Sequence, residues 1–177
     1  MGDFTQKHSM VHLELVEAST VKLEKMLQEG EVDLVMDNSE LDEQTYERQI
    51  FRKEYLVLAV PRGLEGNKGL EPFQITSDAI RDLSFLEDGV EAVDLRHFAN
   101  ESFILLKPGN DTRARAMEIC SLGNFTPNII FELDQQMTSY NITCSGMGIS
   151  FISDTLISRV PMLADVVYYK LPVETGE

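Results

Sequence analysis

Strand-like and helix-like patterns alternate along the second half of the chain, and this alternation limits the folds that it can adopt. Phe103 to Leu106 is an apolar run typical of a strand, and Thr112 to Leu122 is a helix pattern. Asn128 to Leu133 is predicted to be the next strand, Gln135 to Ser145 the next helix and Ile149 to Ile152 a third strand. This order of elements favours an α/β fold.

The first third of the chain shows a similar alternation. Val11 to Val16 alternates apolar and polar residues, as a half-buried strand does. Ser19 or Thr20 then supplies an N-cap for a helix that Gly30 ends. Glu31 to Met36 is predicted to be a second strand. A strand, a helix and a strand joined by short loops indicate a βαβ unit with parallel strands.

Further elements are expected between and after these two regions. Tyr55 to Val60 is apolar throughout, which is typical of a strand buried on both faces, and Pro61 is expected to end it. Asp154 is predicted to cap a short helix, and Val166 to Leu171 to form the last strand. Arg62 to Gly69 contains three glycines and is the best candidate for a boundary between two lobes.

The charge balance excludes some partners. The 177 residues include 30 acidic and 15 basic ones, for a net charge of −15. Such a surface repels phosphate backbones, so this chain is not expected to bind nucleic acid by itself. No apolar run is long enough to cross a bilayer, and no signal-peptide pattern opens the sequence. We therefore expect a cytoplasmic protein with no membrane contact.

Few residues suggest catalysis or metal binding. Cys120 and Cys144 are expected to be buried free thiols, because no CxxC pattern surrounds either. The histidines are His8, His12 and His97; the first two lie four residues apart, but in strand-like sequence that spacing does not align metal ligands. No GxSxG nucleophile motif occurs. We expect no enzyme activity, no catalytic residues, no metal and no cofactor.

Three strand-to-helix joints are the best candidates for a ligand site. They are Glu17 to Thr20, Gly109 to Thr112, and Asp134 to Thr138. Ligands of open α/β sheets collect beyond the carboxyl ends of the strands, and free backbone N–H groups at helix starts suit a carboxylate. The alternative is ordinary helix capping, which every helix needs. Taken one at a time, the joints leave both interpretations open.

Four segments in a fixed order resemble the regulatory domain of LysR-type transcriptional regulators. The segments are "VHLELVEASTVKLEKMLQEGEVDLVM", "YLVLAVP", "VDLRHFANESFILLKPGNDTRARAMEIC" and "SGMGISFIS". Each motif is degenerate, but together they cover roughly residues 4–171 in the order of the family. The resemblance implies a periplasmic-binding-protein-like fold of type 2, with two α/β lobes joined by hinge strands around an effector-binding cleft.

The resemblance also implies the residues that contact the effector. Ser19 and Thr20 match the contacts of the first lobe, the loop 109–112 those of the second lobe, and Gln136 and Met137 the neighbouring helix start. The complete expected set is Ser19, Thr20, Pro61, Gly109, Asn110, Asp111, Thr112, Gln136 and Met137.

The resemblance divides the chain into three parts. Residues 1–61 are expected to form lobe one, 62–165 lobe two, and 166–177 a hinge strand that returns toward lobe one. Family members carry an N-terminal winged helix-turn-helix, which has no counterpart in this sequence. The first strand and most of the first helix of lobe one also have no counterpart, so lobe one is expected to be incomplete.

The expected function is that of an effector-binding domain of a transcriptional regulator. A small molecule, such as a carboxylate or another anion, would bind between the lobes and control the DNA-binding activity of the intact protein. The resemblance implies a homodimer through this domain, with a tetramer possible in the intact protein, and DNA contact only through the absent helix-turn-helix. The alternative is a solute-binding protein of a transport system, which shares the fold; an enzyme on the same fold is disfavoured.

Overall fold

The computed structural model describes residues 2–37, 41–160 and 165–172. The chain forms two compact units, residues 1–46 and residues 47–177. The sequence predicted boundaries between lobes and a hinge strand at residues 61 and 165. These boundaries differ from the limits of the two compact units and stay a prediction. In the described part of the chain no helix is long and apolar enough to span a bilayer.

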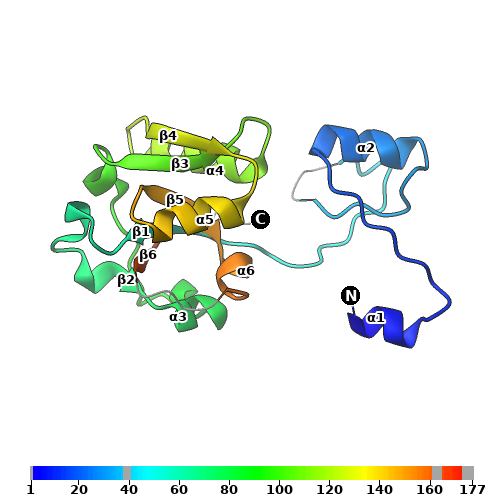
Figure 1. Cartoon of the computed structure of the whole chain (residues 1–177), viewed down its shortest axis with the longest axis horizontal. Helices are drawn as coiled ribbons and strands as arrows, with labels where there is room; N and C mark the ends of the chain where they lie inside the picture. The colour runs from blue at the N-terminus through cyan, green and yellow to red at the C-terminus, as the bar shows by residue number, and fades with distance from the viewer. Residues whose placement is uncertain (1, 38–40, 161–164, 173–177) are drawn as a thin grey trace. The chain divides into compact units, whose positions relative to one another are not determined.

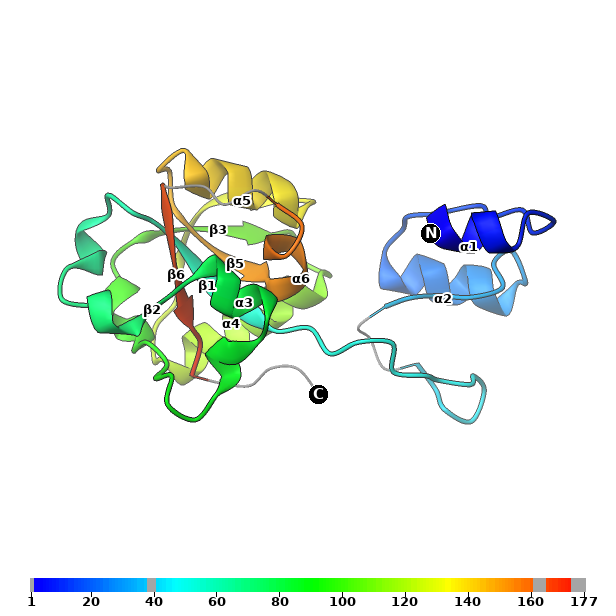
Figure 2. The same cartoon turned by 90° about the horizontal axis from the view of Figure 1, so that it is seen from below.

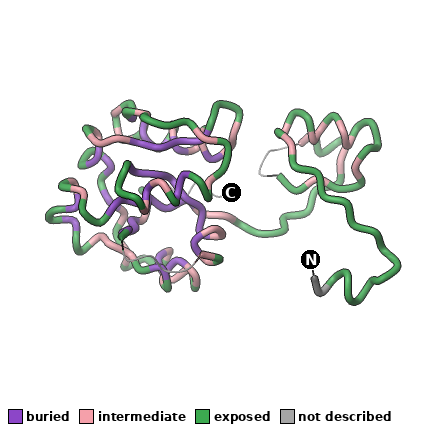
Figure 3. Tube along the Cα trace, in the orientation of Figure 1, coloured by how far each residue is buried: buried purple, intermediate pink, exposed green. Residues whose placement is uncertain are grey.

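Among the described residues of the first unit there are two helices, α1 (Gly2–Lys7) and α2 (Thr20–Gln28). Ser19 is the N-cap of α2, and Gly30 follows its end with a φ of +70°, a left-handed conformation that glycine adopts without strain. The predicted helix and both of its boundaries are therefore confirmed. Among the side chains of this unit whose burial is described, none is buried (Figure 3).

The two strands predicted in the first unit are wrong. Val11 to Val16 and Glu31 to Met36 have no regular secondary structure, and neither pairs with another segment among the described residues. Leu15 and Leu34 are each 73% exposed. A strand is stabilised by its hydrogen-bonded neighbours, so alternating apolar residues do not produce one where no partner strand is present. The predicted βαβ unit is therefore absent from the described structure.

The second unit contains a mixed sheet of six strands in the order β2-β6-β1-β5-β3-β4 (Figures 1 and 2). The strands are β1 (Leu56–Pro61), β2 (Gln74–Ile75), β3 (Ser102–Leu106), β4 (Asn128–Leu133), β5 (Ile149–Ser153) and β6 (Val166–Lys170). Strand β3 pairs in parallel with β4 and β5, whereas β1 pairs antiparallel with β5 and β6. The predicted α/β architecture is confirmed here.

Helices cover both faces of this sheet. They are α3 (Ser77–Arg81), α4 (Asp111–Leu122), α5 (Gln136–Cys144) and α6 (Asp154–Ile157), with four short 3-10 helices, η1 (Glu65–Asn67), η2 (Glu71–Phe73), η3 (Ser84–Leu86) and η4 (Leu95–Phe98). Strand β1 is buried throughout and alternates between two hydrophobic cores. Leu58 packs on the side of α4 and η4, and Val57 on the side of α3, α5 and α6. Figures 1 and 2 show α4 and α5 on opposite faces.

The chain reverses its direction of travel across the sheet between β3 and β5. From β3 it runs through α4 to β4 on one side, then through α5 to β5 on the other side of β3. Because parallel crossovers are right-handed, the two helices must lie on opposite faces. The carboxyl ends of β3 and β5 therefore form a topological switch point, which is where open α/β sheets leave a crevice for ligands.

Asp154 has a different role from the predicted one. The N-cap of α6 is Ser153, whose hydroxyl accepts a hydrogen bond from the Leu156 N–H at 3.3 Å. Asp154 is the first residue of α6, is fully buried, and uses its carboxylate to bind Arg52 and the backbone of Tyr55. The sequence therefore predicted the N-cap of α6 to within one residue. It did not predict that the Asp154 carboxylate binds Arg52.

Candidate functional site

The loop after β3 is a tight turn that leads directly into α4. The Asn110 N–H donates to the Lys107 carbonyl at 3.3 Å, with Pro108 and Gly109 at the two central positions. Gly109 has a φ of +89°, which the third residue of a type II turn requires and which glycine supplies without strain. The turn ends β3 and starts α4 within four residues, so it fixes the first turn of the helix at the sheet edge.

The structure brings two of the predicted joints together. The Gln136 Nε2 group, at the start of α5, donates to the Thr112 hydroxyl, in the first turn of α4, at 2.7 Å. The Gln136 Oε1 atom accepts from the Ser153 N–H at 3.1 Å. One amide side chain therefore links the starts of two helices with the end of β5, at the switch point of the sheet.

The helix starts at this edge lack side-chain caps. Asn110 and Gln135 are the N-caps of α4 and α5, and neither side chain accepts a hydrogen bond from its helix. Their carbonyls begin the helical ladders, accepting from Ala114 and Ser139. Since the first N–H groups of a helix have no intrahelical acceptor, these two helix starts present donors that an anion can use.

The cations near this edge are engaged with carboxylates. Lys107 Nζ lies 2.8 Å from Asp134 Oδ2, and Arg115 Nη1 lies 3.6 Å from Asp111 Oδ2. Arg113 contacts the Glu132 carboxylate and also donates to the Leu106 carbonyl at 2.8 Å. Because these side-chain charges are paired, the partial positive charge expected at this edge is that of the two helix starts.

Other side chains of the predicted set differ in exposure. Thr112 is only 6% exposed, whereas Met137 is 43% exposed and beside Gln136 in α5. The Oδ1 atom of Asn110 is buried and, among the described residues, has no hydrogen-bond partner. A buried acceptor without a donor is costly, so the atom suits a donor group of a bound molecule or water.

Within the second unit, Pro61 lies apart from this cluster. Pro61 ends β1 and pairs with Val166, whereas the other end of β1, Leu56, pairs with Ser153 beside the cluster. Five residues of strand separate the two ends by about 17 Å. Ser19 and Thr20 belong to the first unit, where Ser19 caps α2 without a side-chain hydrogen bond.

Helix α5 is held on the sheet by buried hydroxyl pairs. The Thr143 and Ser150 hydroxyls lie 2.7 Å apart, and those of Tyr140 and Tyr168 lie 2.6 Å apart. Burial raises the pKa of Tyr140 above its usual range, and the contact with the Tyr168 hydroxyl raises it further. Burial also raises the pKa of Tyr168. The two pairs fix the helix whose first residue is Gln136.

Sequence reasoning missed the residues at the end of β5 and just after it that contact this cluster. The Ser153 and Thr155 hydroxyls lie 2.9 Å apart, and Thr155 donates to the Glu54 carboxylate at 2.5 Å. Glu54 is 101 residues away in the sequence, so no local pattern could reveal the contact. The one available signal was the polar run Ser153-Asp154-Thr155 directly after a buried strand, which is a ligand-site position in an α/β sheet.

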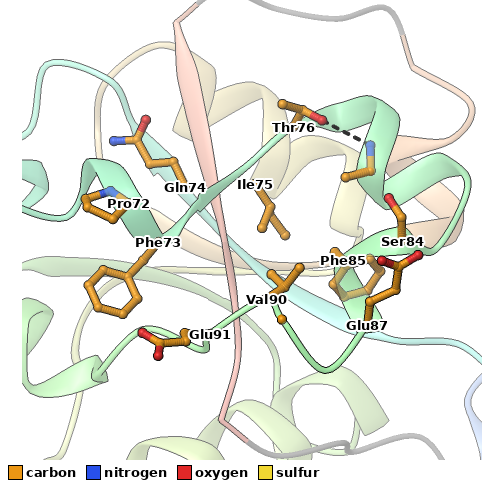
Figure 4. Close-up of a pocket in the computed structure, with 12 residues that line it drawn as sticks. Pro72, Phe73, Gln74, Ile75, Thr76, Ser84, Phe85, Glu87, Val90 and Glu91 are labelled. Atoms are coloured by element: carbon orange, nitrogen blue, oxygen red, sulfur yellow. Dashed lines mark hydrogen bonds between the residues drawn. The ribbon is translucent and has the colours of Figure 1, made fainter.

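A hollow of about 440 Å³ lies elsewhere in the second unit, between β2 and the loop that carries η3 (Figure 4). Its lining comes from residues 72–79 and 84–91 and includes none of the predicted effector contacts. Within the described part of the chain, no group of three or more histidine, cysteine or acidic residues is placed to hold a metal ion.

Comparison with known proteins identifies the family. Residues 1–175 match the model of the LysR substrate binding domain. The uncharacterized HTH-type transcriptional regulator YcgK of Bacillus subtilis is 29% identical over 150 residues, which are 85% of this chain and 45% of YcgK. The chain thus spans less than half the length of this relative.

Solved structures show the same fold. The regulatory domain of CcmR from Synechocystis PCC6803, in complex with 2-PG, has a TM-score of 0.70 at 17% identity, over 97% of this chain and 72% of that one. The effector binding domain of BenM, with its effector benzoate, has a TM-score of 0.61 at 21% identity, over 98% and 70%. The predicted periplasmic-binding-protein-like fold of type 2 is confirmed, and the chain belongs to the LysR substrate binding domain family.

Proposed function

We propose that this chain is the effector-binding portion of a LysR-type transcriptional regulator and that it binds a small anion at the edge of the sheet where α4 and α5 start. The observation that carries the proposal is the Gln136–Thr112 hydrogen bond of 2.7 Å, which joins two uncapped helix starts at the switch point. Ligands of open α/β sheets bind at this position.

A carboxylate or another small anion suits the chemistry of this edge. The two helix starts offer backbone N–H donors and partial positive charge, while the nearby side-chain cations are paired. Benzoate, bound by the effector binding domain of BenM, is a carboxylate. The Thr112 hydroxyl accepts from Gln136, so its own hydrogen can be donated to an anion.

The proposed contacts in the second unit are the loop 109–112, Gln136 and Met137. Ser19 and Thr20 are added from the first unit because the resemblance to the family assigns them this role. Pro61 is left out, since it lies at the far end of β1 from Thr112. An effector can shift the arrangement of the protein only by binding one arrangement better than another; a hundredfold preference corresponds to about 2.7 kcal/mol.

The regulator is favoured over the solute-binding protein as the parent of this domain. The matched relatives are HTH-type transcriptional regulators, and the family model is that of LysR proteins. For the intact protein we propose a cytoplasmic homodimer, or a tetramer, that contacts DNA through a helix-turn-helix outside these 177 residues and has no catalytic role.

A thermal-shift screen followed by calorimetry tests the binding site. The panel contains benzoate, shikimate and inorganic phosphate, together with other small carboxylates, because a ligand of the native state raises its apparent stability. For the best compound, Thr112→Val should weaken binding about tenfold or more, since it removes a hydroxyl donor to an anion without changing the side-chain shape.

Thr126→Val is the matched control. Thr126 is exposed in the loop before β4, at the opposite end of the strands from Thr112, so binding should change by less than about twofold. Equal affinity of the Thr112 variant and the original chain would overturn the site assignment. A panel of anions without a single stabilising compound would overturn the proposed ligand class.

A further inference from the structure

The segment that leads from the first unit into the sheet is fastened to the end of β5. We call residues 52–55 the entry segment. Arg52 Nη2 donates to Asp154 Oδ2 at 2.8 Å, and the Tyr55 N–H donates to Asp154 Oδ1 at 3.0 Å. The Asp154 N–H returns a bond to the Tyr55 carbonyl at 2.9 Å. The Asp154 carboxylate is fully buried, so it depends on these donors.

A second set of contacts fastens Glu54. Its carboxylate accepts from the Thr155 hydroxyl, and its backbone carbonyl accepts from Arg115 Nη2 at 3.2 Å. Because the Thr155 hydrogen is used in this bond, its oxygen accepts from Ser153, whose own oxygen accepts from the Leu156 N–H. The bonds therefore form a directed chain from α6 to the entry segment.

Gln136 connects this chain to the proposed effector site. Its Oε1 atom holds the Ser153 N–H, and its Nε2 group holds the Thr112 hydroxyl. Ser153 pairs with Leu56 at the start of β1, so the link ends where the entry segment becomes a strand.

We propose that Gln136 couples the binding of an effector at Thr112 to the stability of the hydrogen bonds between the entry segment and the residues at the end of β5. The proposal rests on the proposed function, because it needs an anion at Thr112. An anion that accepts the Thr112 hydrogen polarises the hydroxyl and makes its oxygen a better acceptor for Gln136 Nε2. This fixes the amide, keeps Oε1 on the Ser153 N–H, and so tightens the contacts of Asp154 and Thr155 with residues 52–55.

The consequence is a conformational signal that reaches the segment through which the chain enters the sheet of the second unit. Residues 52–55 belong to the second unit, shortly after its first residue, Glu47, and they precede the first pair of the β1–β5 ladder. No pair of the β1–β5 ladder includes them, so their opening does not break that ladder, and local opening is a property of segments that move in ligand-dependent transitions. Breaking the link at Gln136 should release the entry segment even when no effector is present.

Amide hydrogen exchange of the 177-residue chain, measured by NMR without any effector, tests this coupling. Gln136→Leu removes both bonds of the amide, and Gln135→Leu is the matched control, because Gln135 is exposed and makes no cap bond. In the Gln136 variant the Tyr55 and Ser153 amides should exchange about five to ten times faster, and in the control less than twofold faster.

The possible outcomes separate the coupling from simple destabilisation. Faster exchange at Ser153 with unchanged exchange at Tyr55 would overturn the proposal. If the amides of β1 also exchange faster in the Gln136 variant, destabilisation of the whole unit becomes a second explanation, and Thr155→Val then separates the two explanations. This variant breaks the chain of hydrogen bonds at a position away from α5. If the β1 amides stay protected in it and the Tyr55 amide exchanges at its original rate, the coupling is overturned. Since no effector is used, a failure here is independent of a failure to find a ligand.

Discussion

The buried hydroxyl pair beneath α5 permits a sharp test of how this helix is held in place. The Thr143 and Ser150 side chains are both fully buried, and their oxygens lie 2.7 Å apart. Thr143→Val keeps the shape of the side chain but leaves the Ser150 hydroxyl without this partner. Ser150→Ala has the reverse effect on Thr143.

The structure sets the size and sign of the expected effects. A buried polar group that loses its partner costs about 1–3 kcal/mol, whereas replacing both members of a pair by apolar groups is nearly neutral. Each single variant should therefore lower the free energy of unfolding by about 1–3 kcal/mol. The double variant should be no less stable than either single variant, so the coupling should be at least as large as the larger single loss, about 1–3 kcal/mol.

Urea unfolding followed by circular dichroism measures these differences, with free energies taken from midpoints and slopes. Ser145→Ala is a suitable control, because Ser145 is exposed at the end of the same helix and should change stability by less than about 0.5 kcal/mol. If the losses of the two single variants simply add in the double variant, the hydroxyl pair does not fasten α5 and the reasoning is refuted.

Two further predictions concern titratable groups. The hydrogen bonds from the Arg96 side chain and backbone lower the pKa of Asp94 to about 2, so its contribution to stability is present above its ordinary pKa and is lost as the pH falls toward 2. Asp94→Asn should therefore lose less stability than the original chain between pH 5 and 2.5 in urea titrations; equal losses would contradict this. Burial raises the pKa of Cys120 to about 12 and also raises that of Cys144, so both thiols should react slowly with Ellman's reagent at pH 8 and rapidly in denaturant. Fast labelling of native Cys120 would be inconsistent with its burial.

Local signals were sufficient to predict α4 and α5. The predicted helix from Thr112 to Leu122 agrees with α4 to within one residue, and the predicted helix from Gln135 to Ser145 agrees with α5 to within one residue at each end. Both follow strands and carry turn or cap chemistry at their ends. Such signals act over a few residues. They therefore predict the helix correctly wherever the tertiary structure packs the segment against the rest of the protein.

Long-range pairing was not predictable from the same kind of signal. Val11 to Val16 and the run of β1 are both apolar enough for strands, but only β1 has neighbours, β5 and β6, on its two sides. The joints at Thr112 and Gln136 could each be named from the sequence, yet not the bond between them. Their side chains meet because α5 crosses back over β3, which is a property of the strand order.

The sequence by itself determined the α/β class, the positions of most elements of the second unit and the order of motifs that identifies the family, because propensity, caps and turns act locally. The tertiary structure decided which of these segments pair, where the two helix starts meet, and that Asp154 holds Arg52 rather than capping a helix. These contacts join residues up to about a hundred positions apart, and their geometry follows from the sheet order, which no local pattern encodes.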